Sequence, residues 1–422
     1  MQGAAVYLMS KEYSVDQVGY FLKGIAIVND LGDYTLRGVE PGHPYLLMAG
    51  KRRVPNLPAI SEAPTDLELR RPAFVPTFYP GSPEPEGGIQ IALRAGERRE
   101  GLDFRMLRGQ SYCIEGMLAG VGPAGGRFMI AGQEYRGTTA WGGGMVEIPM
   151  GGTVGSDGKF RICDLRAGNY RLTGYVGHPS DPNTPPEFGT VDVMITDNDV
   201  KKVQVNVNPG LRIPGGVSWE GTPPDFTTPS RVMVNLEPTN RTSLEGEPEY
   251  VIRSPCPGEF QFPYVLIDEY YVQAGVNAAG VFVKDILYGT TSVLHTSLRV
   301  GSAVGNAEIR VLLAHDGGKI SAKVADKDGN PVPDIHVVIM PAEVPSESAL
   351  SPRMIFGETD QDGNYSYYTA LPPGKYIVLA TEQRVDHTVE RISKIWQARE
   401  RGKVVEVGPN ATVQVTIEPA TI

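Results

Sequence analysis

The sequence of 422 residues is poor in cysteine and contains no long apolar run. Every stretch long enough to cross a bilayer, about 18 residues, is interrupted by charged or polar side chains, so the sequence predicts no membrane-spanning helix. Three cysteines are too few for a disulfide framework, and their odd number allows at most one intrachain bridge. The first residues have neither a basic leader nor a long apolar core, so no signal peptide is predicted.

An excess of basic charge is also absent. Lys and Arg number 39 against 49 Asp and Glu, which gives a formal net charge of −10, and no long run of Lys or Arg offsets it. Such a chain repels the phosphate backbone of nucleic acids, so nucleic acid is excluded as a partner. The 50 glycines and 35 prolines predict many turns, and an apolar content of 41% is enough for packed cores.

Motifs of catalysis and of cofactor binding are missing as well. The six histidines are scattered singly, and there is no His-Glu-x-x-His, Cys-x-x-Cys, Gly-x-Ser-x-Gly or phosphate-binding glycine loop. Asp326-x-Asp328 and Asp360-x-Asp362 resemble the start of a calcium loop, but neither has the glycine and the acid that such a loop requires further on. We interpret these acids as turn residues. The sequence therefore predicts no catalytic residue, no metal site, no cofactor and no enzyme activity.

One pattern is present four times, and it is the strongest signal in the sequence. Each copy contains a turn rich in Gly, Asp or Pro, an alternating apolar and polar run, a second turn and a second run, which predicts a meander of strands. The copies occupy residues 29–46, 155–172, 257–274 and 359–380. The third copy has lost its second Pro-Gly turn.

The spacing of the copies predicts the domain organisation. Repeats roughly 100 residues apart, with frequent turn signals, are typical of β-sandwiches. We therefore predict an all-β fold of four tandem Ig-like or transthyretin-like β-sandwich domains. Their predicted bounds are 1–108, 109–210, 211–316 (degenerate) and 317–422. Short linkers with Gly or Pro restrict movement between the domains and favour a rod.

Helical patterns are rare. The clearest one covers residues 384–401, where apolar residues share one helical face: Val385, Val389, Ile392 and Trp396. A weaker helical pattern covers residues 13–22.

The fourth domain carries a resemblance to a known family. Residues 318–339 contain an opening strand, a Gly-x-Pro-Val turn and a second strand, followed by Thr-Asp-x-x-Gly-x-Tyr and Leu-Pro-Pro-Gly-x-Tyr. This order resembles the carboxypeptidase regulatory-like domain, a transthyretin-like or carbohydrate-binding-like β-sandwich found in tandem in large bacterial secreted and surface proteins. The resemblance is strong over 317–422, good over 1–108 and weaker over 109–316. It implies an extracellular or cell-surface location and a domain that is not itself catalytic.

Comparison with the fourth domain predicts that the first domain lacks its opening strand. The strand next to the gap would then have an open edge, and it contains Ala4, Ala5, Val6, Tyr7 and Leu8. Open edges invite aggregation or strand addition from another chain. Two interpretations stay open here: the sequence has lost its upstream part, or a neighbouring subunit fills the gap and the chains join end to end into a filament.

Aromatic residues in turns and at strand ends are candidates for contact with a saccharide or with another subunit, although core packing is the alternative. These candidates are Trp141, Trp219, Tyr264, Tyr270 and Tyr271. Cys113 and Cys163 fall in two strands of the second domain, where either a disulfide or two buried thiols would fit.

Together these features predict a non-enzymatic extracellular structural or adhesive protein. One form of this hypothesis is a filament subunit joined end to end by strand addition at the first domain. Its predicted partners are further copies of itself, another surface protein or a polysaccharide. The alternative is a carbohydrate-binding module protein.

Overall fold

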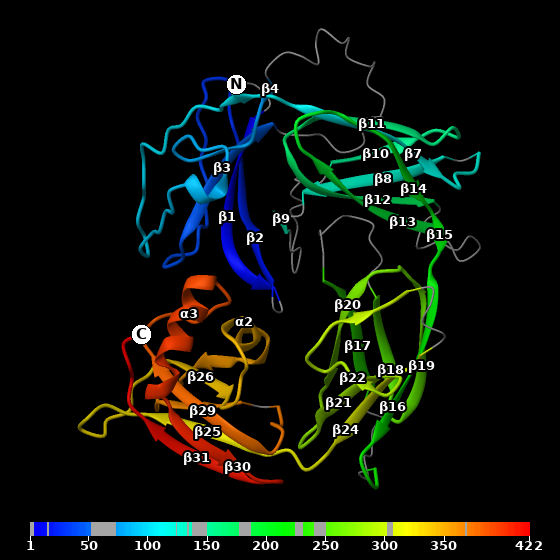
Figure 1. Ribbon diagram of the computed structural model, residues 1–422. Coiled ribbons are helices and arrows are strands. Elements are labelled where there is room, and N and C mark those ends of the chain that lie inside the picture. Colours follow the sequence, from blue (N-terminus) through cyan, green and yellow to red (C-terminus); the bar gives the residue numbers. More distant parts are fainter. Residues whose placement is uncertain are drawn as a thin grey trace. The chain divides into compact units, whose positions relative to one another are not determined.

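The computed structural model describes residues 4–14, 17–51, 73–123, 125–132, 135–136, 150–176, 187–223, 231–239, 250–301, 307–367 and 369–422. Strands make up most of the regular structure, and the helices are few and short (Figure 1). The predicted all-β fold class is therefore confirmed. No helix in these ranges is long and apolar enough to span a bilayer.

The described residues divide into two compact units. Unit 1 contains those up to Gly210 except Glu12–Val18, and unit 2 contains Glu12–Val18 and those from Leu211 onward. Unit 1 holds two groups of sheets and unit 2 holds two more, and we call these groups the first, second, third and fourth modules.

The first module is built on one five-stranded sheet in the order β5-β3-β1-β2-β9. The strands are β1 (Ala4–Ser14), β2 (Gln17–Ile27), β3 (Tyr45–Lys51), β5 (Thr77–Phe78) and β9 (Tyr135–Arg136). A short helix, η1 (Pro85–Gly87), follows β5, and β4 (Ala73–Phe74) pairs separately with β6 (Arg108–Gly109). The helix predicted over residues 13–22 is therefore wrong, because residues 13–14 belong to β1 and residues 17–22 belong to β2.

Both faces of strand β1 are buried. Tyr7 and Met9 of β1 belong to one apolar cluster, and Val6 and Leu8 belong to a second one. Among the described residues, irregular segments rather than a second sheet pack against the second cluster, through Val28, Tyr34, Leu36, Val39, Tyr79, Leu102, Phe104 and Met106. Alternation along β1 therefore separates two apolar faces instead of an apolar and a polar face.

The second module is a β-sandwich with sheets in the orders β10-β8-β12-β13-β15 and β11-β7-β14. Its strands are β7 (Tyr112–Ala119), β8 (Gly126–Gly132), β10 (Met150–Val154), β11 (Lys159–Leu165), β12 (Gly168–Val176), β13 (Glu187–Ile195), β14 (Val200–Asn206) and β15 (Asn208–Pro209). Leu118, Phe128, Phe160 and Leu172 pack in the core between the sheets.

The third module has sheets in the orders β19-β16-β24-β21-β22 and β18-β17-β20-β23. Its strands are β16 (Leu211–Trp219), β17 (Arg231–Pro238), β18 (Tyr250–Pro255), β19 (Gly258–Val265), β20 (Glu269–Val276), β21 (Phe282–Tyr288), β22 (Thr291–Ser292), β23 (Leu298–Arg299) and β24 (Ile309–Ala314). Val234, Phe262, Tyr270 and Val311 are among its buried core residues.

The fourth module has sheets in the orders β28-β25-β31 and β27-β26-β29-β30. Its strands are β25 (Lys319–Val324), β26 (His336–Pro341), β27 (Ile355–Glu358), β28 (Asn364–Ser366), β29 (Gly374–Thr381), β30 (Lys403–Val407) and β31 (Thr412–Ile417). Its helices are α2 (Glu347–Leu350), η2 (Ser351–Arg353), α3 (Val389–Ala398) and η3 (Arg399–Arg401).

Helix α3 covers the outer face of the four-stranded sheet of this module (Figure 1). The Thr388 side chain caps its first turn by accepting a hydrogen bond from the Arg391 N–H at 3.3 Å. Ile392 and Ile395 are fully buried against Leu379 and its neighbours in the sheet. The helix predicted within residues 384–401 is therefore confirmed.

The turns of the repeat place glycine where only glycine fits. Gly158 and Gly363, which follow Asp in the second and fourth copies, have φ of +67° and +74°. A Cβ atom would lie 2.2 Å from the Leu118 carbonyl oxygen at Gly158, and 2.5 Å from the Val324 carbonyl oxygen at Gly363. In both modules the opening strand thus runs directly against this turn, so the repeated Asp-Gly sequence reflects a repeated backbone contact.

A tyrosine near the second turn of each copy bonds back to the main chain. Each hydroxyl donates to a carbonyl four or five positions earlier: Tyr45 to Glu40 (3.0 Å), Tyr170 to Arg166 (3.0 Å), Tyr270 to Leu266 (3.0 Å) and Tyr376 to Pro372 (2.7 Å). Burial raises the pKa of Tyr376 to about 12, so this hydroxyl remains a donor at neutral pH. These bonds are tyrosine corners of the kind seen in immunoglobulin-like sandwiches.

Candidate functional site

The outer edge of β2 carries a strand from the sequence of the second module. Tyr20 and Phe21 of β2 pair in parallel with Tyr135 and Arg136 of β9, which is the last strand of the first sheet. In chain order β9 comes between β8 and β10. The chain thus joins two modules by strand addition, in which backbone groups at a sheet edge pair with an extended segment.

The open edge predicted for the first domain lies elsewhere. The residues predicted to form it are Ala4, Ala5, Val6, Tyr7 and Leu8. They lie in β1 between β3 and β2, with Ala5 opposite Gly50 of β3, and none is more than 4% exposed. The prediction is wrong because residues 17–27 form strand β2, which lies beside β1 on the side opposite to β3.

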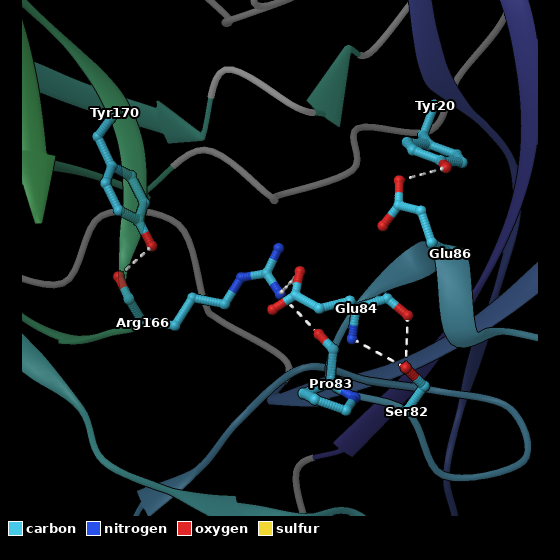
Figure 2. Close-up of polar contacts among 7 residues, drawn as sticks. All are labelled: Tyr20, Ser82, Pro83, Glu84, Glu86, Arg166 and Tyr170. Atoms are coloured by element: carbon cyan, nitrogen blue, oxygen red, sulfur yellow. Dashed lines mark hydrogen bonds and ion pairs between the residues drawn. The ribbon is translucent and has the colours of Figure 1, made fainter. Parts of the chain in front are cut away.

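Arg166 joins the first two modules at a second place (Figure 2). Its guanidinium Nη1 donates to the Pro83 carbonyl oxygen at 2.7 Å and lies 3.4 Å from Glu84 Oε2. The Arg166 side chain is 15% exposed, whereas that of Glu84 is 60% exposed. The bond to the carbonyl is the shorter of the two contacts and is charge-assisted, so it is the stronger candidate for holding the joint.

Both sides of this joint are held in place by local hydrogen bonds (Figure 2). The Arg166 carbonyl accepts the Tyr170 tyrosine-corner bond, which fixes the turn before β12. On the other side, Ser82 Oγ accepts from the Glu84 N–H at 3.1 Å, and the Tyr20 hydroxyl lies 3.4 Å from Glu86 Oε1. The joint thus connects the β2 edge, η1 and the β11–β12 turn.

A disulfide lies close to this turn in the sequence. Cys113 of β7 and Cys163 of β11 are bonded, where the register between the strands shifts from Ile162 to Leu165. The bridge replaces regular pairing at that point and ties down the end of β11 that leads to Arg166. Cys256 is free and half-buried, and burial raises the pKa of its thiol.

The acidic turns of the fourth module serve the backbone. Asp326 Oδ1 accepts from the N–H groups of Asp328 (2.9 Å) and Asn330 (2.8 Å), and Asp360 Oδ1 accepts from Asp362 (3.0 Å) and Asn364 (2.8 Å). The Asn330 side chain and these N–H groups lower the pKa of Asp326. Across the described ranges, no three His, Cys, Asp or Glu side chains gather in a way that could hold a metal ion.

The aromatic candidates are not brought together. Tyr270 is 1% exposed, its ring meets Tyr250 edge-on at 5.6 Å, and its hydroxyl forms the tyrosine corner of the third module. Contact of Tyr270 with a saccharide or subunit is therefore a wrong prediction. Trp219 is half-buried and lies 6.2 Å from the His315 ring, and Tyr264 is half-buried in β19. Trp141 lies outside the described residues.

Tyr271 points to the other face of β20 from Tyr270 and is half-buried. Its cross-strand partner on β17 is Glu237, and the next pair on the same face is Gln273 with Asn235. The Asn235 amide donates to Glu237 Oε2 at 3.4 Å. One ring, two amides and a carboxylate thus share a sheet face.

The sequence interpretation missed the β2 edge and Arg166. A signal for the edge existed: exposed Lys23, Ile25 and Ile27 alternate with inward Gly24 and Ala26, which is a period of two. No local signal marks Arg166, because its partner Pro83 is 83 residues away.

Comparisons with known proteins give a likeness of fold only. No family model matches the chain, and no curated protein matches it. Among solved structures, the Bacillus anthracis TIE protein is 11% identical over 99% of this chain and 68% of that chain, with a TM-score of 0.19. A streptococcal ancillary pilin is 10% identical over 74% of this chain and 100% of that chain, with a TM-score of 0.23. BcpA, the major pilin subunit of Bacillus cereus, is 12% identical over 73% of this chain and 98% of that chain, with a TM-score of 0.18. Superpositions this loose carry no argument about the function of this chain.

Proposed function

We propose that the chain is a non-enzymatic structural or adhesive protein that acts by self-association. The observation that carries this proposal is the pairing of β9 with β2, because the chain already connects two of its own modules by adding a strand to a sheet edge. The same backbone chemistry can connect separate copies. The net charge of −10 favours solubility of such an assembly.

The Cys113–Cys163 disulfide supports a place of action outside the cytoplasm, on the cell surface or in the extracellular medium. Disulfides form and persist in oxidising compartments and are rare where glutathione and thioredoxin keep thiols reduced. The two cysteines are joined, and the third is half-buried.

The fourth module supports the narrower assignment to the carboxypeptidase regulatory-like type. Its opening strand β25 lies beside β28, which follows the Asp362-Gly363 turn, and beside the closing strand β31. The Leu-Pro-Pro-Gly-x-Tyr element leads into β29, and its tyrosine, Tyr376, forms the corner. Helix α3 is an addition on the outer face.

Negative-stain imaging and light scattering of the purified full chain over a range of concentrations test the proposal. We expect assemblies whose mass grows with protein concentration. A chain that stays monomeric at every concentration, with the far-ultraviolet dichroism of a folded β protein, would contradict it. An Ile89→Lys variant, altered at an exposed residue outside the strands, is the control for non-specific association.

A second candidate function is saccharide binding at the face that carries Tyr271. Aromatic rings stack on sugars, while amides and carboxylates bond to their hydroxyl groups. We expect binding on a glycan array that is lost in Tyr271→Ala and retained in Trp219→Ala, since Trp219 packs against the third core. No binding, or binding that is lost only in Trp141→Ala or Trp219→Ala, would contradict this assignment.

A further inference from the structure

Beyond Phe21, the outer edge of β2 has no neighbouring strand in the described part of the chain. β9 pairs only with Tyr20 and Phe21, whereas β2 continues to Ile27. Among the described residues, the backbone N–H and C=O groups on this side of residues 22–27 thus have no partner strand, and such a row is a template for another strand.

Apart from Lys23, the side chains of this edge offer little protection against pairing. Ile25 is 37% exposed and Ile27 is 50% exposed on the outward face, and residues 22–27 contain no proline. The edge strand β19 of the third module differs, since Glu259 and Gln261 alternate outward and Pro263 removes one donor. The β2 edge is thus the more receptive of the two.

The edge strand β30 of the fourth module has matching features. It ends the four-stranded sheet, and β29 is its sole partner strand within the described ranges. Val404 is 61% exposed and Glu406 is exposed on one face, while Val405 and Val407 point into the core. Each edge thus presents an apolar and a charged residue two positions apart.

We propose that the β2 edge of one copy pairs antiparallel with the β30 edge of a second copy, with Ile25 opposite Val404. This register places Lys23 opposite Glu406 on the same face, so an apolar pair and an opposite-charge pair stabilise the contact. Lys23 already has a polar contact in its own chain, and its ammonium group has three donors, so one contact does not prevent the other.

The choice of β30 over a second β2 rests on this charge match. Two β2 edges paired symmetrically about Ile25 would set each Lys23 opposite Ile27 and leave both ammonium groups without an acidic partner across the interface. That arrangement would also close into a dimer. Pairing of β2 with β30 joins different surfaces and leaves one edge free at each end, so it extends into a chain of subunits unless it closes into a ring.

A charge-swap experiment on the full chain tests this inference, which rests on the proposed function. We expect Lys23→Glu and Glu406→Lys each to weaken association roughly tenfold in sedimentation velocity, since each sets like charges opposite one another. The double variant should return to within about threefold of the natural chain. Lys201→Glu and Glu259→Lys, both on exposed residues of the second and third modules, are the matched charge controls. Ile25→Thr keeps strand propensity and should also weaken association.

The outcomes separate the two proposals. Assemblies that form normally in both single charge variants would overturn the pairing of β2 with β30 while self-association stands. Weakening by Ile25→Thr but by neither charge variant, with a dimer as the limit, would overturn it in favour of two β2 edges. A natural chain without any assembly would contradict the proposed function itself. Circular dichroism and thermal unfolding of each variant exclude loss of fold as the cause.

Discussion

The first and fourth modules share their turn chemistry but differ in what covers their sheets. Both contain a tyrosine corner, formed by Tyr45 and Tyr376. The fourth module closes its inner core with a second sheet and its outer face with α3. In the first module, irregular segments cover one face, and the sheet ends in a strand from the second module. The repeated sequence therefore specifies the local meander of strands, whereas the segments that pack on the sheet faces differ from module to module.

The largest expected effect concerns the cover of the fourth module. Ile395 is fully buried beneath α3, so Ile395→Ala should lower the free energy of unfolding by about 2–5 kcal/mol in urea titrations. Ser393→Ala, at a partly exposed position of the same helix, is the control. A loss below about 1 kcal/mol would mean that α3 is a loosely held addition.

The joint between the first two modules comes next. Arg166→Ala removes a charge-assisted bond to the Pro83 carbonyl and should destabilise unit 1 by about 1–2 kcal/mol. Glu84→Gln removes only the ion pair with an exposed carboxylate and should cost at most about 0.5 kcal/mol. If thermal unfolding shows that the two variants lose equal stability, the ion pair rather than the bond to the carbonyl holds the joint.

The tyrosine corners allow a matched comparison. Tyr376→Phe and Tyr45→Phe each remove one hydroxyl and leave the ring, so each should cost about 1 kcal/mol. Similar losses in urea unfolding would show that the shared turn chemistry contributes equally under different covers. If Tyr45→Phe leaves the free energy of unfolding unchanged, contacts other than the corner bond hold that turn in the first module.

The smallest expected effect is a pH dependence in the fourth module. Burial, Arg384 and Arg391 lower the pKa of His336 below its usual 6.5, although Glu358 and Asp386 act in the opposite direction. The unfolded chain then binds a proton more readily than the folded one, so stability is full above pH 6.5 and falls as the pH drops below it.

Thermal unfolding between pH 5 and 8 checks this dependence. In a His336→Gln variant, stability should fall less steeply as the pH drops below 6.5 than it does in the natural chain. If its profile matches that of the natural chain, other groups are responsible.

Much of the fold could be predicted because its signals are local. Asp-Gly turns, period-two runs and the helix with Ile392 on its apolar face depend on neighbours within one or two turns of chain. The burial of Tyr270 was also accessible, since it occupies the place of Tyr170 and Tyr376 in the repeat. The position of Tyr270 near a turn suggests an exposed side chain. In the structure its hydroxyl forms the corner bond and its ring packs in the core against Tyr250, so the side chain is buried.

The site was less accessible from the sequence. Residues 13–22 carry a weak helical pattern, yet Tyr20 and Phe21 lie in a strand paired on both sides. Tertiary pairing overrode that local preference, as it often does for short ambiguous segments. The comparison with the fourth domain predicts an open edge at β1, whereas β1 is an inner strand and β2 lies beyond it.

The amino-acid order by itself determined that this protein is made of repeated β meanders with glycine corners, because steric limits on the backbone and the alternation of side chains act over a few residues. Only the tertiary structure decided which strand forms the edge of the first sheet, that β9 completes it and that Arg166 reaches Pro83. These contacts join residues 83 or more positions apart, and chain closure over such distances leaves no pattern in the sequence between them.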